Sequence, residues 1–244
     1  MLLEQKRISI RPLSDSALVV QLDKEINSII HKNIMNLVKL IEEEPFEGFV
    51  EAVPCYNNVT IFYNPISVRR HVSHVPFKSA FEKVSASMME YLDMLDDKMD
   101  IKNRLIEIPV VYGEEFGPDL EYVARFNNIT PEKVIELHTK QDYLVYMIGF
   151  APGFPFLGGI DKRIATPRKE KPRLSIPAGS VGIAGEQTGM YPLETPGGWQ
   201  VIGKTPIELF TPKTSPPTYL QSGDKIRFIA ISKDDYLAYK EPKQ

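Results

Sequence analysis

The sequence contains a single cysteine, Cys55, which excludes a disulfide bond within the chain and suits a reducing compartment. No apolar run approaches the roughly 20 residues that a membrane helix needs. Residues 1–10 also lack the continuous apolar centre of a secretory signal peptide. These absences predict a cytoplasmic protein without a membrane partner.

The chain also lacks an excess of positive or negative charge. The 244 residues include 29 Lys and Arg against 32 Asp and Glu, a formal net charge of −3, so we expect no nucleic-acid partner. Hydrophobic residues make up 43% and charged residues 25% of the chain. These fractions are typical of a globular protein and argue against a disordered one.

Glycine is scarce in the first half, where only Gly48 precedes Gly113, whereas eleven of the fifteen glycines lie at 149–203. Apolar alternation predicts strands and apolar residues three or four apart predict helices. The resulting order is strands at 7–13 and 16–22, a helix at 26–41, strands at 49–53 and 59–63, and a helix at 81–95. We therefore predict an α+β chain in which residues 1–100 form a small split β-α-β N-terminal domain, linked to the second domain by the charged stretch 93–103.

Residues 101–244 are expected to form the second domain. It begins with a strand at 105–112 and helices at 119–126 and 131–139, the last one capped by Thr130 with Pro131 in its first turn. Short apolar runs broken by Gly and Pro then predict a β-barrel or sandwich. These runs lie at 144–148, 174–176, 182–184, 199–202, 207–210 and 225–229.

The segment GFAPGFPFLGG, at 149–159, combines aromatic residues with glycine and proline. Its stiff backbone would project Phe150, Phe154 and Phe156 at fixed angles, while Gly149 and Gly153 let a ligand or another chain approach the backbone. The alternative is a barrel corner packed with phenylalanine. Both interpretations stay open at this point.

A second glycine-rich segment, PAGSVGIAGEQTGMYP at 177–192, has glycines three or four residues apart. Successive exposed amides in such turns form an anion-binding nest. Just upstream, PRKEKPR at 167–173 offers Arg168, Lys169, Lys171 and Arg173, and arginine grips a carboxylate or phosphate through two parallel hydrogen bonds. A solvated basic loop is the alternative interpretation.

Residues 198–205, GWQVIGKT, match the P-loop expression, which requires a preceding strand and a following helix. A strand-like run lies inside the motif and Pro206 leads into another, so we reject a P-loop, although Lys204 stays a candidate contact for an anion. Ser180 lacks the first glycine and the strand–turn–helix setting of a nucleophile elbow, which argues against a serine hydrolase.

Histidine offers few candidates. His71 and His74 have H-x-x-H spacing without a third ligand, so we expect no metal site. His138 ends the predicted helix at 131–139, where the helix C-terminus would favour its charged form. It is either a capping histidine or a proton carrier beside the glycine-rich segments.

Taken together, four segments make the sequence resemble the KipI family, the B subunits of 5-oxoprolinase, which are related to allophanate hydrolase subunit 1. They are YGEEFGPDL at 112–120, the two glycine-rich segments above, and TPGGWQVIGKTP at 195–206. The resemblance covers essentially the whole chain and implies a cyclophilin-like β-barrel for the C-terminal domain. One departure is Lys204, where arginine is expected as often, and lysine loses the bidentate geometry.

The resemblance also implies an enzyme. A KipA-type C subunit together with a LamB/YcsF-type A subunit would join this chain to open 5-oxoproline to glutamate, with ATP as co-substrate of the complex. As catalytic residues we predict Arg168 and Arg173 for the substrate carboxylate or phosphate, and His138 for proton transfer. The predicted substrate-binding residues are Gly149, Phe150, Gly153, Gly179, Ser180, Gly182, Gln187, Tyr191, Gln200 and Lys204.

Family resemblance implies a second activity, inhibition of a sporulation sensor histidine kinase through its dimerisation and phosphotransfer domain. Phe150, Phe154 and Phe156 would then be contact anchors, because aromatic side chains dominate interface energetics. We favour the role in the enzyme, because a small-ligand pocket better explains glycine nests beside arginines.

Overall fold

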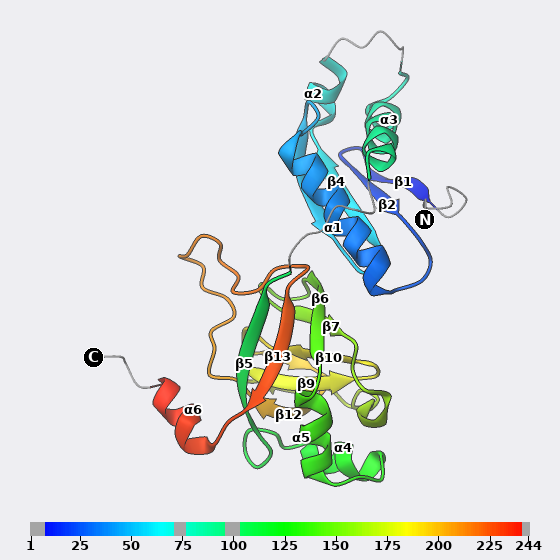
Figure 1. The fold of residues 1–244 in the computed structure, drawn as a ribbon. Helices are drawn as coiled ribbons and strands as arrows, with labels where there is room; N and C mark the ends of the chain where they lie inside the picture. The colour runs from blue at the N-terminus through cyan, green and yellow to red at the C-terminus, as the bar shows by residue number, and fades with distance from the viewer. Residues whose placement is uncertain (1–7, 71–76, 96–102, 241–244) are drawn as a thin grey trace. The chain divides into compact units, whose positions relative to one another are not determined.

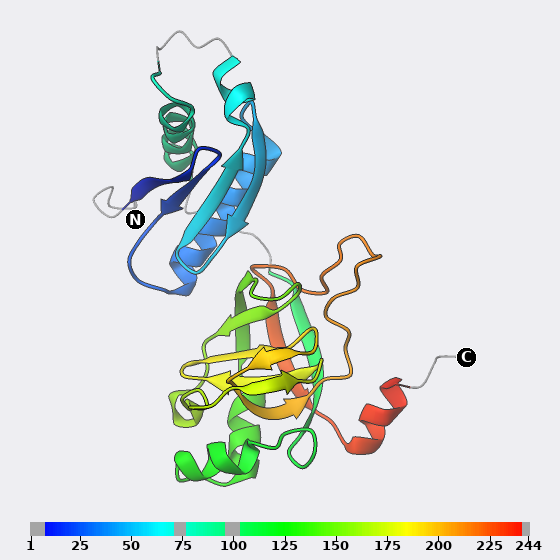
Figure 2. The same cartoon turned by 180° about the vertical axis from the view of Figure 1, so that it is seen from behind.

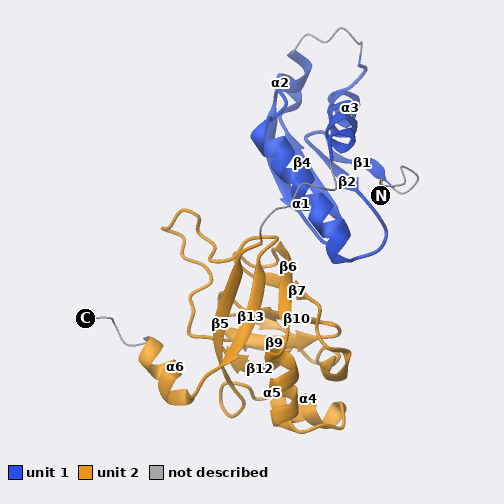
Figure 3. Cartoon of the chain, viewed as in Figure 1, with its two compact units in different colours: residues 1–102 blue, residues 103–244 orange. Residues whose placement is uncertain are grey.

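The computed structural model describes residues 8–70, 77–95 and 103–240. It divides into two compact units, residues 1–102 and 103–244, each with its own hydrophobic core (Figure 3). His71 and His74 lie outside the described residues, as does most of the predicted link at 93–103.

The first unit is a four-stranded antiparallel sheet in the order β1-β2-β4-β3, with helices packed on it (Figure 1). Helix α1 joins the parallel strands β2 and β3, and β4 lies between them, antiparallel to both. This confirms the split β-α-β prediction, and the additional strand beside β2 is the N-terminal β1. The strands are β1 Ser9–Ser14, β2 Ala17–Gln21, β3 Phe49–Pro54 and β4 Asn58–Tyr63, and the helices are α1 Ser28–Glu43, α2 Pro65–Arg70 and α3 Ala80–Asp93.

Side-chain caps set the start of the two long helices. The Asn27 side chain accepts a hydrogen bond from the Ile30 amide at 2.9 Å, and Ser79 does the same for α3. Helix α1 therefore begins at Ser28, so Ile26 precedes the helix. Ile29 lies in its first turn and is 72% exposed. The predicted apolar stripe is wrong at these two positions, while Ile34, Leu37 and Ile41 are fully buried, as the spacing indicates.

The second unit is a closed barrel of seven strands in the order β10-β7-β6-β13-β5-β12-β9, which confirms the barrel prediction (Figure 1). The pairs are antiparallel except β13 with β5. Valine, isoleucine, leucine and phenylalanine side chains fill the interior. The barrel strands are β5 Leu105–Tyr112, β6 Asp142–Ile148, β7 Pro155–Gly158, β9 Ser180–Ala184, β10 Gln187–Met190, β12 Gln200–Lys204 and β13 Lys225–Ala230.

The strand predicted at 207–210 is wrong. There only Phe210 pairs, as an isolated bridge with Thr218. The segment facing it contains Pro212, Pro216 and Pro217, and proline cannot donate a hydrogen bond to a strand ladder. Outside the barrel, β8 Arg173–Ile176 and β11 Thr195–Gly197 form a separate two-stranded sheet.

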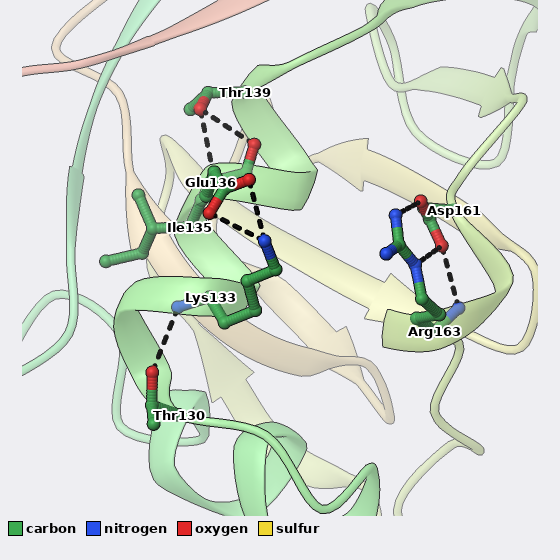
Figure 4. Close-up of polar contacts among 7 residues, drawn as sticks. All are labelled: Thr130, Lys133, Ile135, Glu136, Thr139, Asp161 and Arg163. Carbon is green, nitrogen blue, oxygen red and sulfur yellow. Dashed lines mark hydrogen bonds and ion pairs between the residues drawn. The ribbon is translucent and has the colours of Figure 1, made fainter.

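Helices α4 Leu120–Phe126 and α5 Pro131–Thr139 pack together at one end of the barrel, as Figure 2 shows from behind. Thr130 caps α5 by accepting from the Lys133 amide at 3.2 Å, and Pro131 occupies its first turn, as predicted (Figure 4). The short 3-10 helix Lys162–Ile164 and the terminal helix α6 Lys233–Lys240 complete the unit. Within the described part of the chain, no helix has the length and apolarity needed to cross a membrane.

Candidate functional site

Four aromatic side chains from three separated segments meet outside the barrel interior. We call Phe154, Phe156, Tyr191 and Trp199 the aromatic cluster. The Phe154 ring is the centre: its centroid lies 4.9 Å from Phe156, 5.3 Å from Tyr191 and 5.4 Å from Trp199. The three segments singled out in the sequence therefore converge, and aromatic packing brings them together.

Glycines make this packing possible. A Cβ atom on Gly189 would lie 2.9 Å from the Pro155 carbonyl oxygen and 3.1 Å from the rings of both Phe154 and Trp199. A Cβ atom on Gly197 would collide with Tyr191. These glycines give the rings room, which explains part of the glycine-rich pattern without any ligand.

The predicted amide nest at 177–192 is wrong, because the segment forms the hairpin β9–β10 and uses its amides internally. The Gly179 amide donates to the Tyr191 carbonyl and the Gly185 amide to the Thr166 carbonyl, both at 2.7 Å. Gly182 and Gly189 face each other within the ladder. No row of amides is left to hold an anion there.

Two other predicted residues of this hairpin lie at its two ends. Ser180 begins β9 and is 2% exposed. Gln187 lies beside the turn, opposite Ala184, about 13 Å along the strands from the Ser180 end. The structure therefore does not bring Gln187 together with Gly179 and Ser180.

The basic segment, residues 167–173, lies over the aromatic cluster. The Arg168 guanidinium carbon is 5.9 Å from the centroid of the Trp199 ring, a cation–π distance. The Lys169 amide donates to the Gly198 carbonyl at 2.7 Å, which ties the segment to the chain before β12. Arg168 is exposed, and within the described ranges it forms no ion pair with a carboxylate.

Asp119, which precedes α4, is the buried anion beneath the basic segment. It accepts from both terminal nitrogens of Arg173, at 2.6 and 2.8 Å, and from the Lys169 ammonium at 3.0 Å. The Val201 amide donates to the same carboxylate at 2.7 Å. Burial alone would raise the pKa of Asp119, but the hydrogen bonds from Arg173, Lys169 and Val201 outweigh it, and the pKa is lowered.

Sequence reasoning missed Asp119, although the residue lies in the YGEEFGPDL segment. Its position just before a helix indicates only a helix start. The structure also changes the expectation for Arg173, because Asp119 occupies the two-pronged face of that guanidinium. Arg168 is left as the arginine that faces solvent above the aromatic cluster.

His138 lies in the barrel interior with no exposed surface. Its Nδ1 is 2.8 Å from the Tyr112 hydroxyl and its Nε2 is 2.9 Å from the Thr188 hydroxyl, which donates to the Gly182 carbonyl. Because the single Thr188 hydroxyl hydrogen goes to Gly182, we assign the ring proton to Nε2, and Nδ1 accepts from Tyr112.

Burial lowers the pKa of His138 to about 3, so the ring is neutral near pH 7. The expectation that a helix terminus favours its charged form is wrong, because desolvation outweighs the helix dipole. Its ring also stacks on Phe228 at 4.4 Å. The ring is closed off from solvent and both of its nitrogens are hydrogen-bonded within the chain, so the packing favours a structural role over a proton carrier.

Gln200 is 2% exposed, and its Nε2 donates to the Pro167 carbonyl at 2.9 Å. Its Oε1 has no hydrogen-bond partner. Side chains alternate along a strand, and Trp199 and Val201 both belong to the core around the aromatic cluster. Gln200 therefore points away from that cluster. Lys204, partly buried, pairs with Ser180 in the β12–β9 ladder.

The loop at 149–154 presents one aromatic ring. The Gly149 amide donates to the Phe154 carbonyl at 3.0 Å and closes the loop, and Gly153 has φ +82°. Phe150 is 68% exposed with φ +70°, a strained backbone conformation for phenylalanine. Phe154 is 1% exposed, so the three phenylalanines do not form one exposed contact surface.

The segment that matches the P-loop expression is not a phosphate loop, as predicted. Residues Gln200–Lys204 are strand β12, paired with β9 and β5. No helix follows in the region described by the structure before α6. This segment therefore does not fit the phosphates of ATP.

Comparison with known proteins gives the family. A model of the carboxyltransferase domain, subdomain C and D, matches residues 8–220. The chain is 52% identical to the 5-oxoprolinase B subunit of Bacillus subtilis (strain 168) over 235 residues, 96% of this chain and 98% of the relative. It is 40% identical to the 5-oxoprolinase B subunit of Escherichia coli O157:H7 over 218 residues, 89% of this chain and 93% of the relative.

A crystal structure of the protein TTHA0988 matches 92% of this chain with a TM-score of 0.73 and 30% identity. The match covers 40% of that longer chain. The curated relatives, by contrast, are matched over nearly their whole length. The chain therefore belongs to the carboxyltransferase subdomain C and D family and, within it, to the B subunits of 5-oxoprolinase.

Proposed function

We propose that this chain is the B subunit of an ATP-dependent 5-oxoprolinase, which opens 5-oxoproline to glutamate while ATP is hydrolysed to ADP and phosphate. The observation that carries the proposal is the 52% identity, over 96% of the chain, to a protein of that name. We further propose that a KipA-type C subunit together with a LamB/YcsF-type A subunit completes the enzyme in the cytoplasm.

The chemistry explains the need for ATP. A five-membered lactam is an unactivated amide, and phosphorylation of its carbonyl oxygen supplies a leaving group for attack by water. Substrate and intermediate are then both anions. Arg168 supports this proposal, because an exposed guanidinium over Trp199 offers charge-assisted hydrogen bonds to a carboxylate or phosphoryl group, each worth about 1.5–3 kcal/mol.

We assign the other predicted residues according to their surroundings. Tyr191 and the rest of the aromatic cluster form the apolar support beneath Arg168. Arg173 holds the basic segment to Asp119. We propose that ATP binds elsewhere than at residues 198–205, since strand β12 does not fit its phosphates.

Reconstitution tests the proposal. The three purified proteins are mixed with 5-oxoproline and ATP, and each component is omitted in turn while glutamate and phosphate are measured. We expect both products only in the complete mixture. Full activity without this chain would contradict the proposal.

Inhibition of a sporulation sensor histidine kinase is a second candidate function, which the exposed and strained Phe150 favours. The purified chain would then reduce kinase autophosphorylation, and Phe150→Ser would relieve the effect. Undiminished autophosphorylation at excess chain would remove this candidate.

A further inference from the structure

Asp119 connects two parts of the second unit that are distant in sequence. On one side its carboxylate holds the side chains of Lys169 and Arg173. On the other side its amide donates to the Val201 carbonyl at 2.9 Å, and its carboxylate accepts from the Val201 amide. One buried residue therefore joins the basic segment to strand β12.

The connection to β12 replaces a missing strand contact. Strand β5 pairs with β12 only at Gly203 and Lys204, so Val201 has no β5 residue opposite it. Asp119 supplies both a donor and an acceptor to Val201 instead. This anchors β12 two residues after Trp199, whose ring lies under Arg168.

The connection to the basic segment holds the chain on the C-terminal side of Arg168. Lys169 follows Arg168 directly and Arg173 lies five residues on, and both end on the same carboxylate. Arg168 itself contacts no carboxylate within the described ranges. Lys169 and Arg173 therefore share the Asp119 carboxylate, whereas the charge of Arg168 has no carboxylate partner among the described residues.

We propose that Asp119 is a positioning residue of the substrate site. It fixes Lys169 and Arg173 against β12 and so holds Arg168 over Trp199, where the guanidinium receives the carboxylate or phosphoryl group of the substrate. Asp119 itself does not touch the substrate. The proposal rests on the proposed function in assigning that ligand, but the placement of Arg168 by Asp119 is tested without it.

The variant Asp119→Asn distinguishes two roles of Asp119: positioning Arg168, or only adding a negative charge to the site. If Asp119 acted only as a negative charge, its removal would make the site more positive and lower KM for an anionic substrate. If it positions Arg168, KM for 5-oxoproline in the reconstituted enzyme rises, by about tenfold for the loss of one charge-assisted contact. The kcat value then changes much less, because ground-state and transition-state binding are weakened together.

Trp199 provides a readout that needs no activity, because it is the only tryptophan of the chain. The fluorescence of the full chain is compared among wild type, Asp119→Asn and Arg168→Met. We expect both variants to change the Trp199 emission in the same direction. A matched control is Asp161→Asn, because Asp161 also binds an arginine through two oxygens, but at the surface with Arg163.

Lys169→Met is the second variant, in case Asp119→Asn fails to fold. It leaves the Asp119–Arg173 pair and the Lys169 backbone bond to Gly198 intact, and we expect a smaller change of emission and KM in the same directions. Wild-type emission in both variants at native melting temperatures would overturn the inference, as would a lowered KM in Asp119→Asn. An inactive wild-type complex would instead overturn the proposed function, while the fluorescence comparison still decides the role of Asp119.

Discussion

The two faces of the barrel wall differ in how completely their polar groups are paired within the chain. Inside, His138 lies in a neutral chain that runs from the Tyr112 hydroxyl through the imidazole to Thr188 and the Gly182 carbonyl, with each donor matched to an acceptor. Outside, Asp119 gathers two cations and a third stands over Trp199. The first arrangement is complete within the chain, whereas the second has positive charge left over for a ligand.

This difference shows how to weigh candidate residues. A buried histidine beside hydroxyl groups suggests proton transfer when only residue types are known. The geometry shows instead that its polar atoms are fully used by the fold. The exposed Arg168 over Trp199 is the better candidate for binding an anion, because its guanidinium is open to solvent and its charge-assisted hydrogen bonds are available.

The largest expected effect comes from comparing one variant on the outer face, Arg173→Ala, with one on the inner face, Tyr112→Phe. Arg173→Ala leaves the Asp119 carboxylate with Lys169 and the Val201 amide alone. We expect it to cost about 3 kcal/mol of unfolding free energy and to raise KM for 5-oxoproline by about tenfold, as for Asp119→Asn. Tyr112→Phe on the inner face removes one neutral hydrogen bond and should cost about 1 kcal/mol. Urea unfolding and turnover assays measure both.

Arg173→Lys sharpens this comparison, because it keeps the charge and loses the two-pronged geometry. Its stability should fall between wild type and Arg173→Ala. Equal stability of Arg173→Ala and Tyr112→Phe would remove the distinction between the two faces.

A second test concerns the glycines beneath the aromatic cluster. Gly189→Ala forces a methyl group against the Pro155 carbonyl and two aromatic rings, so we expect a loss of about 1–3 kcal/mol of unfolding free energy. Gly198→Ala is the matched control, since its added Cβ would meet no atom nearer than 3.6 Å. If the two variants unfold at the same urea concentration, ring packing does not explain the glycine at 189.

The third test uses pH. The pKa of His138 is lowered to about 3 in the fold, whereas an unfolded histidine takes up its proton near pH 6.5. The unfolded state therefore binds more protons between these values, so His138 contributes stability that is full above pH 6.5 and falls as the pH drops, by at most about 1.4 kcal/mol per pH unit. Urea unfolding of wild type and His138→Gln at pH 7 and pH 5 should show this loss in wild type only; equal pH dependence would contradict it.

Local patterns predicted much of the fold because neighbouring residues encode them. Apolar alternation and short apolar runs between glycines and prolines located most strands, and Thr130 and Pro131 marked the start of α5. The strand predicted at 207–210 failed because its partner segment is rich in proline. Such failures occur where pairing depends on a distant segment.

The candidate site was harder to predict, because it depends on contacts across 50 or more residues. Asp119 meets Lys169 and Arg173 from 50 and 54 positions away, and no local pattern signals such a meeting. The glycine spacing at 177–192 suggested exposed amides, yet Gly189 is needed by the rings of Phe154 and Trp199. Among the predicted arginines, Arg168 is the one that the structure places in an exposed position, over Trp199, where it can contact an anionic substrate.

The most direct measurement compares Arg168→Met with His138→Gln in the reconstituted three-protein enzyme, with Arg163→Met as an exposed control. If the outer face binds the substrate, Arg168→Met lowers kcat/KM for 5-oxoproline by about 10- to 100-fold, while His138→Gln at pH 7.5 stays within a few-fold of wild type. A larger loss in His138→Gln than in Arg168→Met, with both variants folded, would contradict the account.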